Sequence, residues 1–186
     1  MKLVIIINII FFLSLGSLAK ETWILDKELS TIKFEIPVLL ANNVKGEFNK
    51  IEGFIVIDTD SKENNKAIFS VDIKSIDMNY KKYKPLLLSM IFFNAKEYPL
   101  ALVDTKKFSY KNQNKLKFDV ELNIKGIVNY VPLELEILQL TEELVQIKGK
   151  LSFSRNSFEI GTGKWSSTKI LKDKALIETN LFLFKE

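Results

Sequence analysis

The chain of 186 residues has no histidine, no cysteine and one arginine among its 27 basic residues, so it cannot build Ser-His or Cys-His nucleophilic sites, or zinc sites with His or Cys ligands. Its net charge of +4 rests almost wholly on lysine, whereas proteins that read nucleic acids depend on arginine. We therefore expect no nucleic-acid partner, no metal and no cofactor.

The first 19 residues have the pattern of a secretory signal peptide. A basic start precedes an uncharged apolar run, Val4 to Leu15, and the small residues Ser17 and Ala19 lie where a signal peptidase would cut. The run is shorter than the roughly 20 apolar residues that span a bilayer, and a retained N-terminal anchor is the alternative. We expect residues 1–19 to be removed and residues 20–186 to form one domain in the periplasm or outside the cell.

Apolar and polar side chains alternate along most of the remaining chain, as in strands that bury one face. Leu116 to Ile124 is the clearest example, with five apolar residues separated by Lys117, Asp119, Glu121 and Asn123. The pattern predicts strands over 31–38, 44–48, 54–57, 69–73, 101–105, 108–110, 116–124, 131–137, 145–153 and 175–184. Many short strands separated by turn signals indicate an all-β barrel or sandwich, here of about eight to ten strands.

One segment departs from the period of two. Residues 83–93 read YKPLLLSMIFF, with Pro85 where the first turn of a helix tolerates proline. We predict a short helix over residues 84–92, and it is too apolar for an exposed helix. It could plug one end of a barrel or form the wall of an apolar pocket.

Two basic features have both a structural and a binding interpretation. Arg155, the lone arginine, could grip an anionic head group bidentately, or could tie down a loop through carbonyl groups. Lys164 opens a lysine-rich stretch that could attract anions or could simply be a solvated loop. The carboxylates Glu134 and Glu136 share one strand face, where charged residues are ordinarily solvated.

Six short motifs occur in order along the chain. They are Thr22–Asp26 with Leu29–Phe34, Val44–Phe48 with Ile51–Ile55, Ile73–Asp77, Leu87–Asn94 ending at Glu97–Pro99, Leu122–Ile127, and Phe153–Phe158 with Gly161. Together they resemble the YceI-like family of exported lipid-binding proteins. The resemblance implies an antiparallel lipocalin-like barrel whose elongated apolar cavity holds polyisoprenoids or other long-chain amphiphiles. The sequence departs from the family at residues 83–87, where an R-D-x-H-L motif is common and this chain reads YKPLL, without the charged and imidazole groups of that motif.

Our leading hypothesis is a carrier for an isoprenoid or related lipid, with no bond made or broken. Its predicted cavity wall is formed by Phe34, Ile36, Phe48, Phe69, Val71, Ile73, Phe92, Phe93, Phe118, Val120, Leu122, Leu133, Leu135 and Phe153, with Arg155 and Lys164 as head-group contacts. An exported enzyme acting on a lipid head group through carboxylate or lysine chemistry is the alternative. An outer-membrane barrel is a third hypothesis, because alternation alone does not say which face is inside. Transient contact with a membrane and homodimer formation are both compatible with this sequence.

Overall fold

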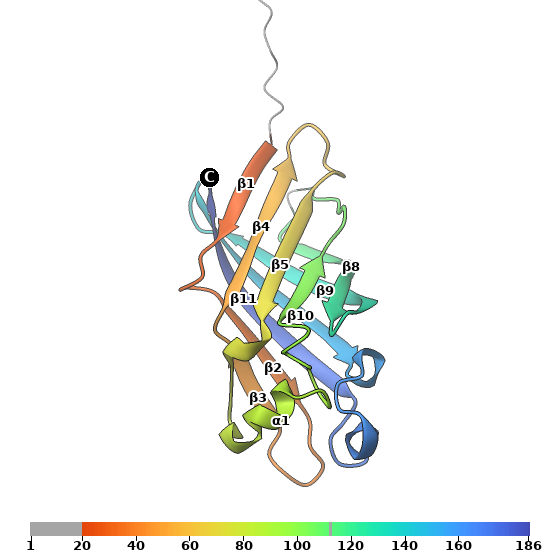
Figure 1. Ribbon diagram of the computed structural model, residues 1–186. Coiled ribbons are helices and arrows are strands. Elements are labelled where there is room, and N and C mark those ends of the chain that lie inside the picture. The colour runs from red at the N-terminus through yellow and green to blue at the C-terminus, as the bar shows by residue number, and fades with distance from the viewer. Residues whose placement is uncertain (1–19, 112) are drawn as a thin grey trace, which may run out of the picture.

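The computed structural model describes residues 20–111 and 113–186, so the predicted signal peptide lies outside the described residues. Eleven strands, one α-helix and four short 3-10 helices follow one another along the described chain (Figure 1). In order they are β1 (Lys20–Leu25), β2 (Thr31–Ile36), β3 (Val44–Phe48), β4 (Ile51–Asp58), β5 (Lys66–Asp72), η1 (Ile73–Ser75), β6 (Ile76–Met78), η2 (Lys81–Tyr83), α1 (Lys84–Leu88), β7 (Leu100–Asp104), β8 (Lys115–Ile124), β9 (Ile127–Gln139), β10 (Leu144–Ser154), η3 (Asn156–Phe158), η4 (Gly163–Ser166) and β11 (Lys174–Lys185).

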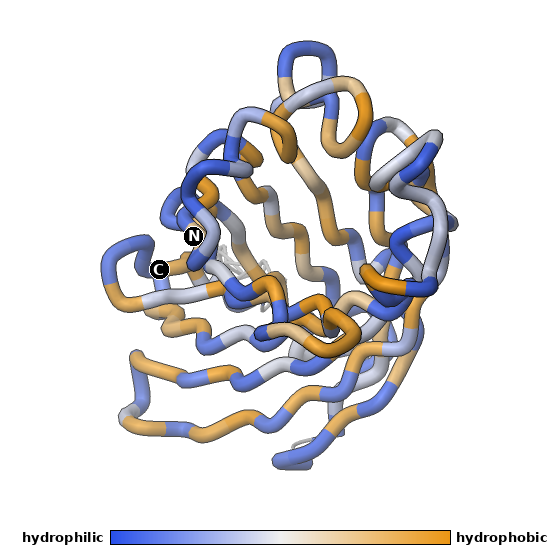
Figure 2. Tube along the Cα trace, turned by 90° about the horizontal axis from the view of Figure 1, so that it is seen from below, coloured by the Kyte–Doolittle hydropathy of each residue, from blue (hydrophilic) through white to orange (hydrophobic). Residues whose placement is uncertain are grey.

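Eight of these strands close an antiparallel barrel. The ring runs β1-β4-β5-β7-β8-β9-β10-β11 and returns to β1 through the pairing of Trp23 with Lys185. Seen from below, the strands surround a common axis, and hydrophobic and hydrophilic residues alternate along them (Figure 2). The all-β barrel predicted from the sequence is therefore confirmed.

The barrel is elongated because β11 has two partners along one edge, while β10 pairs with the other edge. Its C-terminal half pairs with β1, and its N-terminal half pairs with β2, from Leu176 opposite Glu35 to Asn180 opposite Thr31. Strands β2, β3 and β6 continue the sheet from there. Since β2 follows β1, β4 follows β3 and β6 follows β5 along the chain, each pair acts as one long strand with a break. We call the end that carries the start of β1 and the end of β11 the upper end, and the end with α1 the lower end (Figure 1).

Local sequence explains how the longest strands are joined. Ile124 pairs with Ile127 across a two-residue turn in which Lys125 and Gly126 have φ of 58° and 75°. Two positive φ values define the type I′ turn, whose twist matches that of a hairpin. A side chain at Gly126 would also lie 2.8 Å from the ring of Tyr98, so glycine is required there twice over.

The predicted helix over residues 84–92 is too long. Helix α1 ends at Leu88, because Ser89 turns extended and both its N–H and its hydroxyl donate to the carbonyl oxygen of Leu86. A serine that bonds back to the backbone competes with helical hydrogen bonds in this way. The chain then forms turns through Phe92 and Ala95, which are 4% and 1% exposed.

Two further strand predictions need correction, and one strand was not predicted. Residues 108–110 form no strand; Phe108 makes only an isolated bridge with Asn65, and its ring stacks on Phe118 instead. The strand predicted over 69–73 ends at Asp72, whose carboxylate accepts from the Lys74 N–H and starts a 3-10 turn. Strand β6, with three residues, is too short for a period of two to reveal.

Candidate ligand cavity

The upper half of the barrel encloses a cavity of about 610 Å³. Its wall is formed mainly by inward-facing apolar side chains of the eight ring strands, aided by Ile32 of β2 and by Phe108. These are Trp23, Ile32, Ile55, Ile57, Ala67, Phe69, Val103, Phe108, Leu116, Phe118, Leu133, Leu135, Ile137, Val145, Ile147, Leu151, Leu181 and Leu183. Pockets of this size and character ordinarily hold small apolar molecules.

The alternation of side chains along each strand positions this wall. On β8, Leu116 and Phe118 face inward, and their partners on β9, Leu135 and Leu133, do the same. Leu133 is in turn opposite Leu151 on β10. Because neighbouring strands are in register, the inward residues form continuous apolar rows around the barrel.

Close packing within the wall depends on a missing side chain. Gly149 lies on β10 between the inward-facing residues Ile147 and Leu151. A Cβ atom at this position would come within 2.5 Å of the Thr179 hydroxyl and 3.1 Å of a Leu135 methyl group. Glycine thus lets the side chains of β9 and β11 approach β10.

The cavity has a polar rim at the upper end. The rim residues that line it are Glu21, Thr59, Tyr110, Gln139, Glu142 and Lys185. Lys185 forms an ion pair of 2.7 Å with Glu21, and its ammonium group lies 6.0 Å from the centre of the Trp23 ring. The arrangement, an apolar interior under a polar rim, suits a ligand with a hydrocarbon tail and a polar head.

The lower half of the barrel is filled rather than hollow. On each ring strand the inward residues nearer the lower end are packed in the core, as with Val120 on β8 and Val131 on β9, which are 0% and 5% exposed. The segment that contains α1 contributes Leu87, Phe92 and Ala95 to this core. None of residues 84–99 lines the cavity. The helix therefore plugs the lower end and is not a wall of the pocket.

The residues predicted from the sequence as cavity wall fall into two groups, those that line the hollow upper half and those that do not. Four of them line the cavity: Phe69, Phe118, Leu133 and Leu135. The others lie in or against the packed core or line other surfaces: Phe34, Ile36, Phe48, Val71, Ile73, Phe92, Phe93, Val120, Leu122 and Phe153. Their predicted contact with ligand stays a prediction, and the structure gives each a packing role, such as the edge-to-face pair of Phe153 and Phe158 at 5.1 Å.

Several wall residues were not singled out from the sequence. Trp23, Ile55, Ile57, Leu181 and Leu183 line the cavity from β1, β4 and β11. The signal for them was present, since 181 and 183 continue the alternation of the last predicted strand. What the alternation does not give is the height along the barrel at which an inward side chain meets open space.

Arg155 has a structural role that uses all its donors. It is 0% exposed, and its guanidinium donates to the carbonyl oxygens of Ile160, Ser167, Leu171 and Lys172 and to the side-chain oxygen of Asn156. These five hydrogen bonds account for the five N–H groups of an arginine side chain. Burial lowers the pKa of Arg155, an effect that the charge of Asp173 partly offsets. The group thus organises the loop between β10 and β11.

Lys164, the other predicted head-group contact, lies at the lower end. It belongs to η4, and its ammonium group is 5.8 Å from the centre of the Trp165 ring. Trp165 in turn packs edge-to-face on Phe92. The rim of the cavity is at the opposite end of the molecule (Figure 1), so Lys164 is not positioned to meet a head group there.

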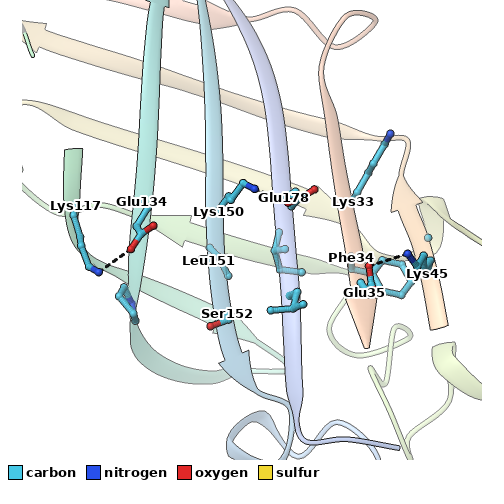
Figure 3. Close-up of a pocket in the computed structure, with 14 residues that line it drawn as sticks. Lys33, Phe34, Glu35, Lys45, Lys117, Glu134, Lys150, Leu151, Ser152 and Glu178 are labelled. Carbon is cyan, nitrogen blue, oxygen red and sulfur yellow. Dashed lines mark hydrogen bonds and ion pairs between the residues drawn. The ribbon is translucent and has the colours of Figure 1, made fainter. Parts of the chain in front are cut away.

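A second concavity, of about 480 Å³, lies over the outer face of β8, β9, β10, β11, β2 and β3 (Figure 3). Charged side chains of alternating sign cross it from strand to strand. Lys117 pairs with Glu134 at 2.7 Å, Lys150 pairs with Glu178 at 2.9 Å, and Lys45 pairs with Glu35 at 3.0 Å. On this side of the barrel the ladder puts charge on the outer surface, where an outer-membrane barrel presents an apolar band.

Two carboxylates of this outer groove have a lowered pKa. Hydrogen bonding to Lys117 lowers the pKa of Glu134, and hydrogen bonds from Asn43 and Lys45 lower that of Glu35. A general acid that works near neutral pH needs a raised carboxyl pKa instead. Among the described residues no cluster of three or more His, Cys, Asp or Glu side chains is placed to hold a metal ion.

The comparison with known protein families agrees with this architecture. The model of the YceI-like domain matches residues 23–182, which is most of the chain. The chain belongs to the YceI-like domain family. The resemblance found from the six sequence motifs is therefore confirmed.

Three solved structures superpose on the chain. BcnA of Burkholderia cenocepacia is 25% identical with a TM-score of 0.76, over 85% of this chain and 98% of that protein. The YCEI protein of Campylobacter jejuni is 25% identical with a TM-score of 0.67, over 81% and 90% of the two chains. A polyisoprenoid binding domain from Saccharophagus degradans, implicated in plant cell wall breakdown, shares the fold at 12% identity and a TM-score of 0.66, over 88% and 98%.

Curated relatives match over a shorter stretch. UPF0312 proteins of Vibrio cholerae are 23% identical over 109 residues, which is 59% of this chain and 58% of the relative. Within residues 20–111 and 113–186, no helix has both the length and the apolar character needed to cross a membrane.

Proposed function

We propose that the protein is a carrier that takes the hydrocarbon chain of a polyisoprenoid or another long-chain lipid into its upper cavity. The observation that carries this proposal is the apolar cavity of about 610 Å³ under a polar rim. Burial of each CH₂ group contributes about 0.8 kcal/mol, so a tail of a few isoprene units supplies most of the affinity of a tight complex. The YceI-like neighbour described as a polyisoprenoid binding domain supports the same ligand class.

The same proposal places the protein in the periplasm or outside the cell. It rests on the signal-peptide pattern of residues 1–19, with the cut after Ala19. In a bacterium fractionated by osmotic shock, we expect the shocked fluid to contain a protein whose N-terminus is Lys20. A protein that keeps Met1 and stays in the cell pellet would contradict this location.

The test of the carrier is direct. The protein is purified without detergent and extracted with organic solvent, and the extract is analysed by mass spectrometry. A stoichiometric isoprenoid or long-chain lipid would support the proposal and identify the ligand. An empty extract, together with no binding of an added fluorescent isoprenoid alcohol, would overturn it.

A matched pair of variants separates the cavity from the outside of the same strand. Ile137→Trp adds bulk to the cavity wall, whereas Val128→Trp adds the same bulk to the outer face of β9, where Val128 is 46% exposed. We expect the first variant to lose at least 10-fold in affinity for the isoprenoid alcohol and the second to bind as the parent does. Equal binding by both variants would place the ligand elsewhere.

A further inference from the structure

The charge of the protein is concentrated at its lower end. Two segments that form this end, residues 79–99 and 155–174, contain nine basic and three acidic side chains and therefore a net charge of +6. Residues 20–186 as a whole carry only +3, so the rest of the described domain is net negative at −3. An asymmetry of this kind orients a protein in front of a charged surface.

The same end exposes large apolar side chains. Leu40, between β2 and β3, is 98% exposed, Met90 is 73% exposed and Ile170 is 67% exposed. Leu40 also has φ of 58°, in the left-handed region that asparagine and glycine occupy far more readily than leucine. A fully exposed leucine in a disfavoured conformation contributes nothing to folding, so its presence calls for another role.

Hydrogen bonds join the loop that carries Leu40 to two neighbouring segments of the lower end. The N–H of Leu39 donates to the carbonyl oxygen of Ile170 at 2.9 Å, which places the tip between β2 and β3 beside the loop before β11. On its other side, the Tyr80 hydroxyl donates to the carbonyl oxygen of Asn42 at 3.1 Å. The loops meet at the bottom of the molecule in Figure 1.

Lysines that have no carboxylate partner in the described chain surround the apolar tips. Lys82 lies 5.1 Å from the centre of the Tyr83 ring, and Lys169 is exposed and precedes Ile170 in the chain. The acidic groups of this end are fewer. One of them, Asp77, forms an ion pair with Lys81, with 4.0 Å between Oδ1 and Nζ. Lysine beside aromatic and aliphatic tips is typical of proteins that sit at the boundary between water and lipid.

We propose that this lower end docks on the surface of an anionic lipid bilayer. Leu40 and Ile170 would enter the head-group layer, while Lys82, Lys164 and Lys169 would meet lipid phosphates. A nucleic acid fits this end less well, because its only arginine is buried and fully hydrogen-bonded. Docking does not depend on the proposed function, since the rim of the cavity is at the opposite end and faces away from the docked surface.

Sedimentation with vesicles tests the proposal on the domain of residues 20–186 without added ligand. One set of vesicles is phosphatidylcholine alone, and the other also contains phosphatidylglycerol. We expect binding only to the second set, weakening as salt rises because the attraction is screened. The variant Lys82→Glu/Lys169→Glu should bind at least about 10-fold more weakly, since each lysine near such a surface contributes roughly 1 kcal/mol.

Two matched controls come from the upper end. Leu40→Asn, which suits the left-handed conformation, should also weaken binding at least 3-fold, whereas Leu140→Asn at the upper end should not. Lys62→Glu/Lys111→Glu carries the same charge change as the lower-end variant and should bind nearly as the parent does. Absence of binding at low salt, binding to both vesicle types alike, binding to polyphosphate but not to vesicles, or equal weakening by upper-end and lower-end variants would each overturn the proposal. Thermal unfolding of every variant shows whether its fold is intact.

Discussion

The upper and lower halves of the barrel use one alternating pattern for opposite purposes. Phe118 and Val120 are neighbours on the same face of β8, yet Phe118 lines the cavity and Val120 is 0% exposed in packed core. The difference arises because loops at the lower end fold back into the barrel, as Phe158 and Phe92 show. The sequence of a strand therefore decides which side chains face inward. The loops that close each end of the barrel decide whether those side chains pack in the core or line a cavity.

The largest expected difference between the two halves comes from a charged side chain placed in the filled lower half. Val120→Asp would bury a carboxylate with no partner, at a cost of several kcal/mol that most domains cannot absorb. We expect the circular dichroism spectrum of this variant to be that of an unfolded chain. Phe118→Asp, two residues away in the hollow half, should fold and lose isoprenoid uptake. A folded Val120→Asp protein would show that the lower half is not closely packed.

The next largest effect concerns the loop that Arg155 organises. Arg155→Met removes five hydrogen bonds and leaves four carbonyl oxygens, of which that of Ile160 is fully buried, without that donor. We expect the free energy of unfolding to fall by about 4 kcal/mol. Urea titration measures the loss, with Lys164→Met as the control that should change stability by less than about 0.5 kcal/mol. A small loss in Arg155→Met would mean that water replaces the guanidinium at little cost.

Truncation of an aromatic ring sharpens the contrast between the halves. Phe158→Ala should cost about 3–4 kcal/mol, because it leaves a cavity in well-packed core. Phe118→Ala should cost less, about 1–2 kcal/mol, since its ring already faces open space and the change mainly removes apolar area and the stack on Phe108. Differential scanning calorimetry of the ligand-free proteins gives both values. Equal costs would argue that the upper cavity is closed in solution.

The smallest effect is electrostatic. Burial acts to raise the pKa of Asp104, but hydrogen bonds from the backbone and side chain of Lys106 and the charges of Lys66 and Lys106 lower it overall. A carboxyl whose pKa is lower in the folded state stabilises the fold above its unfolded pKa of about 3.9, and this contribution disappears as pH falls.

Asp104→Asn should therefore be less stable than the parent at pH 7, by under about 1 kcal/mol, with a difference that shrinks toward pH 3. Urea titrations at several pH values would show this trend, since urea does not screen ion pairs as a salt does. Asp119→Asn is the control, because Asp119 forms no ion pair with the described residues. A difference that grows on acidification would contradict the direction of the pKa change.

The sequence was most informative where one strand alone decides the structure. The alternation over residues 116–124 predicts β8 nearly to its limits, and the family resemblance supplied β1, which alternation did not reveal. Prediction was weaker where distant segments meet. Ser89 ends the helix early, and Phe108 leaves the sheet to stack on Phe118, and both outcomes depend on local or tertiary bonds that a period does not contain.

The candidate site shows the same limit. Four of the fourteen predicted wall residues line the cavity, because the filled half of the barrel is defined by side chains from the α1 segment and η3. The role of Arg155 was also open, since nothing in its neighbours along the sequence shows that the chain from 160 to 172 wraps around it. Both are consequences of loops that return to the barrel.

The sharing of β11 between β1 and β2 has a consequence for how the chain folds. The ring closes only when Trp23 pairs with Lys185. These two residues are separated by nearly the whole domain in sequence, so this pairing forms late in folding. Contacts of such long sequence separation make folding slow, and until they form, the edges of β1 and β11 are open to pairing with other chains. The loss of only the last few residues of β11 would leave β1 without this partner and turn a closed barrel into an open sheet.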